Sequence, residues 1–206
     1  MNHRLFILAT SLLLPGLLFS CQKEEELQPP IEQIIPLQVG NEWQYREYLY
    51  NRDGSLTDSM GIYTRSVLRD TVINKSTWYI LNDRSIVQNA RQGYAYYNAA
   101  SNQGLLVYQG GDMGGVGYNY VYPTYNLWVY TVPTHDRKPI PHSRQMLSGN
   151  LYQVEYQYNY SSPASVQTQK REEWVVPNIG VARADVYYRN TTQLQRRREL
   201  ISYKLK

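Results

Sequence analysis

The stretch LYQVEYQYNY, residues 151–160, decides the fold class. One alternating set of positions carries Tyr152, Val154, Tyr156, Tyr158 and Tyr160, and the other carries Gln153, Glu155, Gln157 and Asn159. Successive side chains of a β-strand point to opposite faces, so this alternation predicts a strand with one aromatic, half-buried face and one polar face. Since no window shows comparable helical periodicity, the sequence predicts an all-β protein.

Composition and turn signals extend this prediction to the rest of the chain. The 206 residues include 21 Tyr and 4 Trp but only 2 Phe, and Tyr, Trp, Val and Thr suit pleated surfaces. Turn-forming runs stand between the apolar segments: NRDG at 51–54, NK at 74–75, SNQG at 101–104 and NTT at 190–192. This spacing predicts eight to eleven strands in a single antiparallel meander, either a curved sheet or half-barrel, or a sandwich.

The amino-terminal part of the chain differs in character from this β segment. An early cation, Arg4, precedes a mostly apolar run from 5 to 19, which is typical of a secretory signal peptide and short for a membrane span. An acidic and proline-containing stretch follows the only cysteine, Cys21. We therefore expect a signal peptide at 1–20, an extended linker at 21–36 and one β domain at 37–206.

The residues around the cysteine, Leu18-Phe19-Ser20-Cys21, resemble the lipobox of bacterial lipoproteins. The resemblance implies that Cys21 becomes the first residue of the mature chain, with a diacylglyceryl thioether and an amide-linked acyl chain such as palmitate. Two or more acyl chains anchor a protein stably where one does not, so the membrane is the expected partner. An acylated Cys21 leaves no thiol for a disulfide, a cysteine-ligated zinc ion or a nucleophile.

Three further stretches resemble small, uncharacterised surface lipoproteins of Bacteroidetes-type bacteria. Lys23, Glu24 and Glu25 are similar to the surface-export signal of that group, although a solvated acidic linker would also look like this. PLQVGNEWQY at 36–45 and WVVPNIGVAR at 174–183 are similar to boxes near the two ends of such domains. The resemblance implies an outer-membrane protein that faces the cell exterior, with a curved sheet like that of lipid-carrier lipoproteins. It brings no catalytic residues with it.

The two family boxes also have a structural interpretation. Gly40 and Asn41 are expected to form a turn that directs Trp43 to one face of a strand. Pro177 and Gly180 are expected to bend an edge strand.

The residues that most often do chemistry form no recognisable catalytic or metal-binding pattern. His135, Asp136 and His142 lie in one proline-rich segment, and two imidazoles are too few ligands for a metal site. Glu172 and Glu173 are adjacent, hence on opposite faces of a strand, which is the wrong geometry for an acid/base pair. The glycine-rich run at 110–117 lacks the Lys-Ser/Thr of a phosphate-binding loop. The sequence predicts no enzyme, no cofactor and no metal site.

Charge gives little reason to expect a nucleic-acid partner. The formal net charge is +4, but Arg197 should point away from Arg196 and Arg198, so the three do not form one basic stripe. Protection of a sheet edge would explain them equally well. Two short segments, Asp58-Ser59-Met60 and Asp70-Thr71-Val72, are similar to O-glycosylation acceptors of Bacteroidetes-type bacteria.

The tyrosines around the glycine-rich run are the candidate ligand face. The strongest candidates are Tyr118, Tyr120 and Tyr122, which directly follow the glycines, while tyrosine as an ordinary core residue is the competing interpretation. We therefore expect a non-catalytic surface lipoprotein that binds a glycan, a lipid or a protein, or else an accessory subunit of an outer-membrane assembly.

Removing the thiol tests the predicted anchor. We expect mass spectrometry of membrane-extracted protein to find an acylated amino-terminal Cys21, and a Cys21→Ser variant to leave the membrane fraction because its acyl chains are absent. A Cys21→Ser chain that still fractionates with membranes would contradict the prediction.

Overall fold

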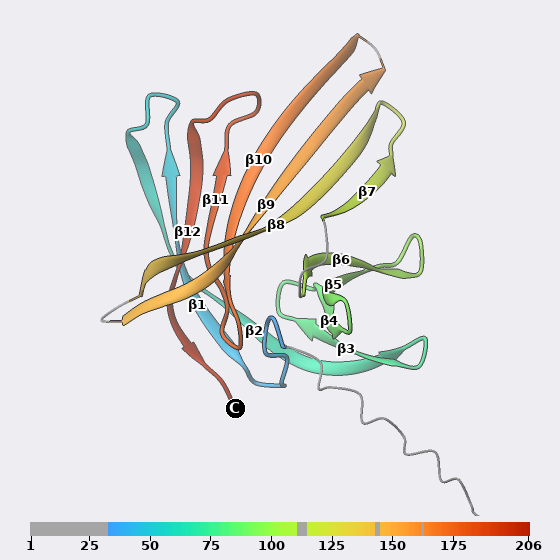
Figure 1. Cartoon of the computed structure of the whole chain (residues 1–206), viewed down its shortest axis with the longest axis vertical. Helices are drawn as coiled ribbons and strands as arrows, with labels where there is room; N and C mark the ends of the chain where they lie inside the picture. Colours follow the sequence, from blue (N-terminus) through green and yellow to red (C-terminus); the bar gives the residue numbers. More distant parts are fainter. Residues whose placement is uncertain (1–32, 111–114, 143–144, 162) are drawn as a thin grey trace, which may run out of the picture. The chain divides into compact units, whose positions relative to one another are not determined.

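The computed structural model describes residues 33–110, 115–142, 145–161 and 163–206, and these residues form an all-β domain (Figure 1). Twelve strands join in one antiparallel sheet, slightly more strands than predicted. The predicted fold class is thereby confirmed, and the curved single sheet is the alternative that forms. No helix among the described residues has the length and apolar character needed to cross a membrane.

The strands follow one another along the chain in two arms. The first arm consists of β1 (Glu42–Tyr50), β2 (Leu56–Ile73), β3 (Ser76–Leu81), β4 (Ile86–Ala90), β5 (Gly93–Asn98) and β6 (Gln103–Gln109). The second consists of β7 (Val116–Val121), β8 (Tyr125–His142), β9 (Gln145–Ser161), β10 (Ala164–Val176), β11 (Gly180–Tyr187) and β12 (Leu194–Lys204). Pairing of β1 with β12 joins the arms, so β6 and β7, consecutive in the chain, are the two edges of the sheet.

The sheet curves until its edges almost meet, as Figure 1 shows. The Tyr118 hydroxyl on β7 donates a hydrogen bond to the Leu106 carbonyl on β6. The Tyr152 hydroxyl on β9, also in the second arm, donates a hydrogen bond at 2.8 Å to the carbonyl of Gln109, the last residue of β6. The short strands β5 and β6 therefore lie over part of the concave face of β9 and β10.

The buried core on the concave side of the sheet is built partly from tyrosine side chains. Tyr94, Tyr108 and Tyr152 are buried, and the Tyr108 ring contacts the other two with centroid distances of 5.6 Å and 5.0 Å. In β9, Tyr152 and Val154 are buried while Gln153 between them is exposed, as the alternating pattern predicts. For these tyrosines, the core interpretation is the correct one.

The two family boxes meet in space. Asn41 is buried, and its side chain donates to the Pro36 carbonyl at 3.0 Å and accepts from the Lys206 amide at 2.9 Å. The Trp43 indole N–H donates to the Ile179 carbonyl at 2.5 Å. The expected turn at Gly40 is present, with φ of 88°. The hydrogen bonds of Asn41 and Trp43 thus connect the start of the domain to Lys206 and to the β10–β11 turn.

The packed domain begins earlier than the predicted boundary at 37. Ile34 and Ile35, assigned from the sequence to the end of the linker, are buried in the core cluster with Trp43 and Val181. The Ile35 carbonyl accepts a hydrogen bond from the Asn89 amide at 2.8 Å. The acidic run and the prolines suggested a spacer, but the two isoleucines cover one end of the core. Residues 21–32 lie outside the described part.

Two interpretations based on sheet edges are wrong. Pro177 and Gly180 flank the turn between β10 and β11, in the interior of the sheet. The arginines at 196–198 lie in β12, which pairs with β1 on one side and β11 on the other, so they protect no edge. The predicted alternation is correct: Arg197 binds the Asp185 carboxylate at 2.9 Å, whereas Arg196 lies 3.1 Å from Glu47 on the opposite face.

Shortening a buried isoleucine tests the revised boundary. We expect Ile35→Ala to lower the free energy of unfolding by about 2–4 kcal/mol, because it removes buried methylene groups and leaves a cavity. Val72, 70% exposed, is the matched control, and Val72→Ala should change stability by less than about 0.5 kcal/mol. Urea denaturation followed by circular dichroism measures both. If both substitutions changed the free energy of unfolding by the same small amount, residues 34–36 would belong to the linker and not to the packed domain.

Candidate functional site

The tyrosines singled out from the sequence line a hollow on the concave side of the sheet. Tyr118 and Tyr120 of β7 are half-buried and Tyr122, just beyond the strand, is 42% exposed. The hollow has a volume of about 350 Å³. Its other walls include Tyr96, Leu105, Val107, Leu127, Val129 and Tyr156.

The remaining tyrosines of the segment from 94 to 130 have different environments. Tyr94 and Tyr108 belong to the dry core, and Tyr130 is exposed on the opposite face of the sheet. The aromatic segment is therefore not one ligand face. Only its part around β7, with Tyr96 from β5, surrounds the hollow.

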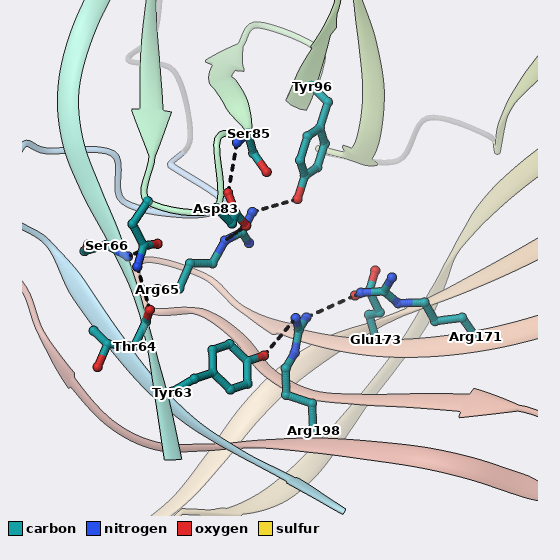
Figure 2. A network of polar contacts seen from close by, with 11 residues as sticks. Tyr63, Thr64, Arg65, Ser66, Asp83, Ser85, Tyr96, Arg171, Glu173 and Arg198 are labelled. Carbon is teal, nitrogen blue, oxygen red and sulfur yellow. Dashed lines mark hydrogen bonds and ion pairs between the residues drawn. The ribbon is translucent and has the colours of Figure 1, made fainter. Parts of the chain in front are cut away.

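The floor of the hollow carries an ion cluster centred on Glu173 of β10 (Figure 2). This carboxylate is buried, and its Oε1 atom accepts a hydrogen bond from Arg171 and lies 3.6 Å from Nη2 of Arg198. Its Oε2 atom accepts from the Tyr108 hydroxyl at 2.8 Å. One carboxylate is thus shared between two guanidinium groups, one from its own strand and one from β12.

A third arginine, Arg65, extends this cluster toward β5. The Arg65 Nε atom lies 3.1 Å from Asp83, and its Nη2 atom donates to the Tyr96 hydroxyl at 2.9 Å (Figure 2). The cluster thus contains three arginines and two carboxylates: Arg65 pairs with Asp83, while Glu173 pairs with both Arg171 and Arg198. Three cations and two anions leave one positive charge in excess beside the hollow.

The protonation states of the cluster are fixed near neutral pH. Burial alone would raise the pKa of Glu173, but the charges of Arg171 and Arg198 and the Tyr108 hydrogen bond outweigh it and lower that pKa. Burial, and then the Glu173 charge, raise the pKa of Tyr108 well above its ordinary value. At neutral pH the Glu173 carboxylate therefore carries its negative charge, and the Tyr108 hydroxyl keeps its proton and donates it in a hydrogen bond to that carboxylate.

The sequence carries a signal for this cluster in the spacing of its charged residues. Arg171 and Glu173 are two residues apart on a strand, hence on one face, and the structure confirms that Glu172 points the other way, where it accepts from the Tyr187 hydroxyl at 2.9 Å. Charged residues at inward positions of a period-two strand are costly unless paired. The inward position of Glu173 therefore predicts a cationic partner, and Arg171, two residues earlier on the same face, is one.

Several predicted sites fall outside this hollow. His135 and His142 lie in β8, but their side chains are outside the described part of the structure, as are Cys21, Lys23, Glu24, Glu25 and residues 111–114. Among described residues, no three His, Cys, Asp or Glu side chains gather as a metal site would require. Ser59 and Thr71 lie in β2, with Ser59 exposed.

Neutralising the central carboxylate tests the cluster. We expect Glu173→Gln to lower the free energy of unfolding at pH 7 by about 3 kcal/mol, because it leaves buried arginine charge uncompensated. A lowered pKa means that this stabilisation is present above the ordinary Glu pKa of about 4.3 and is lost as pH falls through the folded-state value. The difference between the two chains should therefore shrink in acid. Glu172→Gln is the control, with an effect below about 1 kcal/mol. Urea denaturation between pH 7 and pH 3 measures both; a pH-independent difference would contradict the assignment.

Comparison with known proteins gives two solved structures. No protein-family model and no curated protein matches the chain. A Bacteroides fragilis protein described as a "putative exported protein with YmcC-like fold" is 12% identical, with a TM-score of 0.48 over 84% of this chain and 100% of the other. A "putative lipoprotein" of Parabacteroides distasonis is 13% identical, with a TM-score of 0.45 over 85% of this chain and 100% of the other. We draw no functional conclusion from likenesses at this level.

Proposed function

We propose that this chain is a lipid-anchored protein of the outer membrane that faces the cell exterior and binds a small amphipathic ligand without transforming it. Acylated Cys21 would hold it, and Lys23, Glu24 and Glu25 would direct it to the surface. The observation that carries the binding role is the tyrosine- and aliphatic-walled hollow with the Arg171–Glu173 pair at its floor.

The lining of the hollow favours a ligand with an apolar body. Leu105, Val107, Leu127 and Val129 present aliphatic side chains from β6 and β8. Aromatic rings complete the walls, offering flat apolar surface with a polar tip at low cost in conformational entropy. The volume of about 350 Å³ is at the lower end of the ~300–1,000 Å³ typical of small-molecule sites.

The charge at the floor favours an anionic end on that ligand. Arg171 lines the hollow, and the cluster behind it has one more cation than anions. Excess buried charge is costly, and an incoming carboxylate or phosphate would compensate it. Because the cluster is held by its own hydrogen bonds before a ligand arrives, little ordering is needed on binding.

A second candidate function, an accessory subunit of an outer-membrane assembly, is favoured by the edges of the sheet. β6 reads QGLLVYQ and β7 reads VGYNYV, and neither contains a charged residue or a proline. Val121 at the end of β7 is 78% exposed. Free edges are commonly protected by charges or proline, so these two could accept a strand from a partner protein. Stoichiometric co-purification of another protein with the lipidated chain would favour this role.

Titration of single-chain amphiphiles tests the binding role. Isothermal titration calorimetry on residues 21–206 carrying Cys21→Ser should show binding of dodecanoate and of dodecyl phosphate, and weaker binding of dodecyltrimethylammonium, which has the same chain and the opposite charge. Tyr120→Ala should weaken dodecanoate binding about tenfold, or about 1.4 kcal/mol, by removing a wall. Tyr130→Ala, on the other face of the sheet, should not.

Tyr122→Ala repeats the test at a more exposed position if Tyr120→Ala impairs folding. Equal affinity for the two opposite charges would contradict the anionic preference. Absence of binding by all three amphiphiles would contradict the ligand hollow itself.

A further inference from the structure

Two aromatic rings lie exposed on the convex side of the sheet, opposite the hollow. Trp128 and Tyr130 alternate along β8 with Leu127 and Val129, which point to the concave side. Trp128 is 39% exposed and Tyr130 is 40% exposed. No role described above uses either ring.

The two rings are neighbours and nearly parallel. Their planes are within 8° of parallel and their centroids are 6.2 Å apart. That separation is close to the ~6.6 Å advance of two residues along a strand, so the rings lie side by side along β8. Two nearly parallel, partly exposed rings are poor packing for a core, and together they form an aromatic platform that is open to a ligand.

A glycine on the neighbouring strand makes room for this arrangement. Gly117 of β7 pairs with Tyr130, and a Cβ atom at Gly117 would lie 3.2 Å from Cδ1 and 3.3 Å from Cε1 of the tyrosine ring. The ring therefore covers the glycine backbone closely. Any larger side chain at 117 would push the ring away from the sheet.

Hydrogen-bonding side chains border the platform. On β9, Gln157 pairs with Trp128 and Glu155 pairs with Tyr130, placing both beside the rings. Next to Tyr130 lies a hollow of about 700 Å³, twice the volume of the concave one. Its lining includes Gln153, Glu155, Lys170, Glu172, Tyr187 and Thr192.

We propose that this convex face is a second binding site, and that it takes a neutral glycan chain. The faces of aromatic rings are electron-rich and attract the C–H groups on the flat face of a sugar ring. Amide, carboxylate, ammonium and hydroxyl groups together offer the mixture of donors and acceptors that sugar hydroxyls require. Two carboxylates and two cations, Lys170 and Arg171, line the hollow, and Arg171 is paired with Glu173, so no excess positive charge favours an anionic ligand there.

The site can be tested separately from the concave hollow. Val154 and Arg171 line both hollows, but Tyr130 lines only the convex one and Tyr120 only the concave one. Each site can therefore fail without the other.

Trp128 supplies a specific signal for the test. The chain has four tryptophans, and the other three, Trp43, Trp78 and Trp174, are 2%, 4% and 7% exposed. Iodide, which quenches only accessible indoles, will therefore report on Trp128. A bound glycan should protect it from quenching.

The experiment uses residues 21–206 with Cys21→Ser and a panel of neutral hexasaccharides: cellohexaose, maltohexaose, mannohexaose and chitohexaose. At least one should reduce iodide quenching in a saturable way, while a heparin hexasaccharide should not. Tyr130→Ala should weaken that affinity about tenfold. Gly117→Val, which displaces the ring without removing it, should have a similar effect. Tyr120→Ala, on the concave face, is the matched control and should leave glycan affinity unchanged.

Three outcomes would overturn the proposal. The first is no protection of Trp128 by any neutral hexasaccharide. The second is protection that persists unchanged in Tyr130→Ala. The third is protection that depends on protein concentration without glycan, since this would mean that a second copy of the chain covers the platform.

Discussion

Pairing between β1 and β12 is the constraint on which the rest of the domain depends. It is the only ladder in the described sheet that joins the two arms of the chain, and without it β1 to β6 and β7 to β12 would be separate sheets. Asn41 and Trp43 reinforce it by binding the carboxyl-terminal residue and the β10–β11 turn. Because the joined sheet curves, Arg198 of β12 reaches Glu173, and Tyr96 and Tyr108 of the first arm reach the floor and wall formed by the second.

The same curvature makes the two faces of β8 and β9 chemically different. Facing inward, Leu127 and Val129 of β8 and Tyr156 of β9 line a small hollow with a charged floor. On the outside, the intervening residues are two exposed rings with a polar row beside them. Alternation along a strand thus separates the proposed amphiphile site from the proposed glycan site by the thickness of one sheet. A lipid-anchored surface protein with both could hold a membrane-derived molecule and an extracellular polymer together.

Much of this architecture could be predicted because it depends on local pattern. Alternation assigned Tyr152 and Val154 to one face, and adjacency placed Glu172 and Glu173 on opposite faces. Asn74 and Lys75 form the expected two-residue turn, with φ of 50° and 65°. What could not be predicted depends on distant parts of the sheet. Whether a tyrosine is core or lines a hollow is decided by how far β5 and β6 extend over β9 and β10. The burial of Ile34 and Ile35 likewise depends on a core end that only the closed sheet creates.

The order of strands also governs how this domain reaches its native state. Because a chain is synthesised from its amino terminus, β1 is available early, but its partner β12 follows much later. Bringing β1 and β12 together closes a long loop, and the loss of conformational entropy precedes any stabilising contact. Sheets rich in such non-local pairing fold slowly. Until then, the first arm has two open edges, one of them on β1, and both can pair with other chains. Chaperones that hold unfolded chains would therefore affect the folding yield of this protein more than its final stability does.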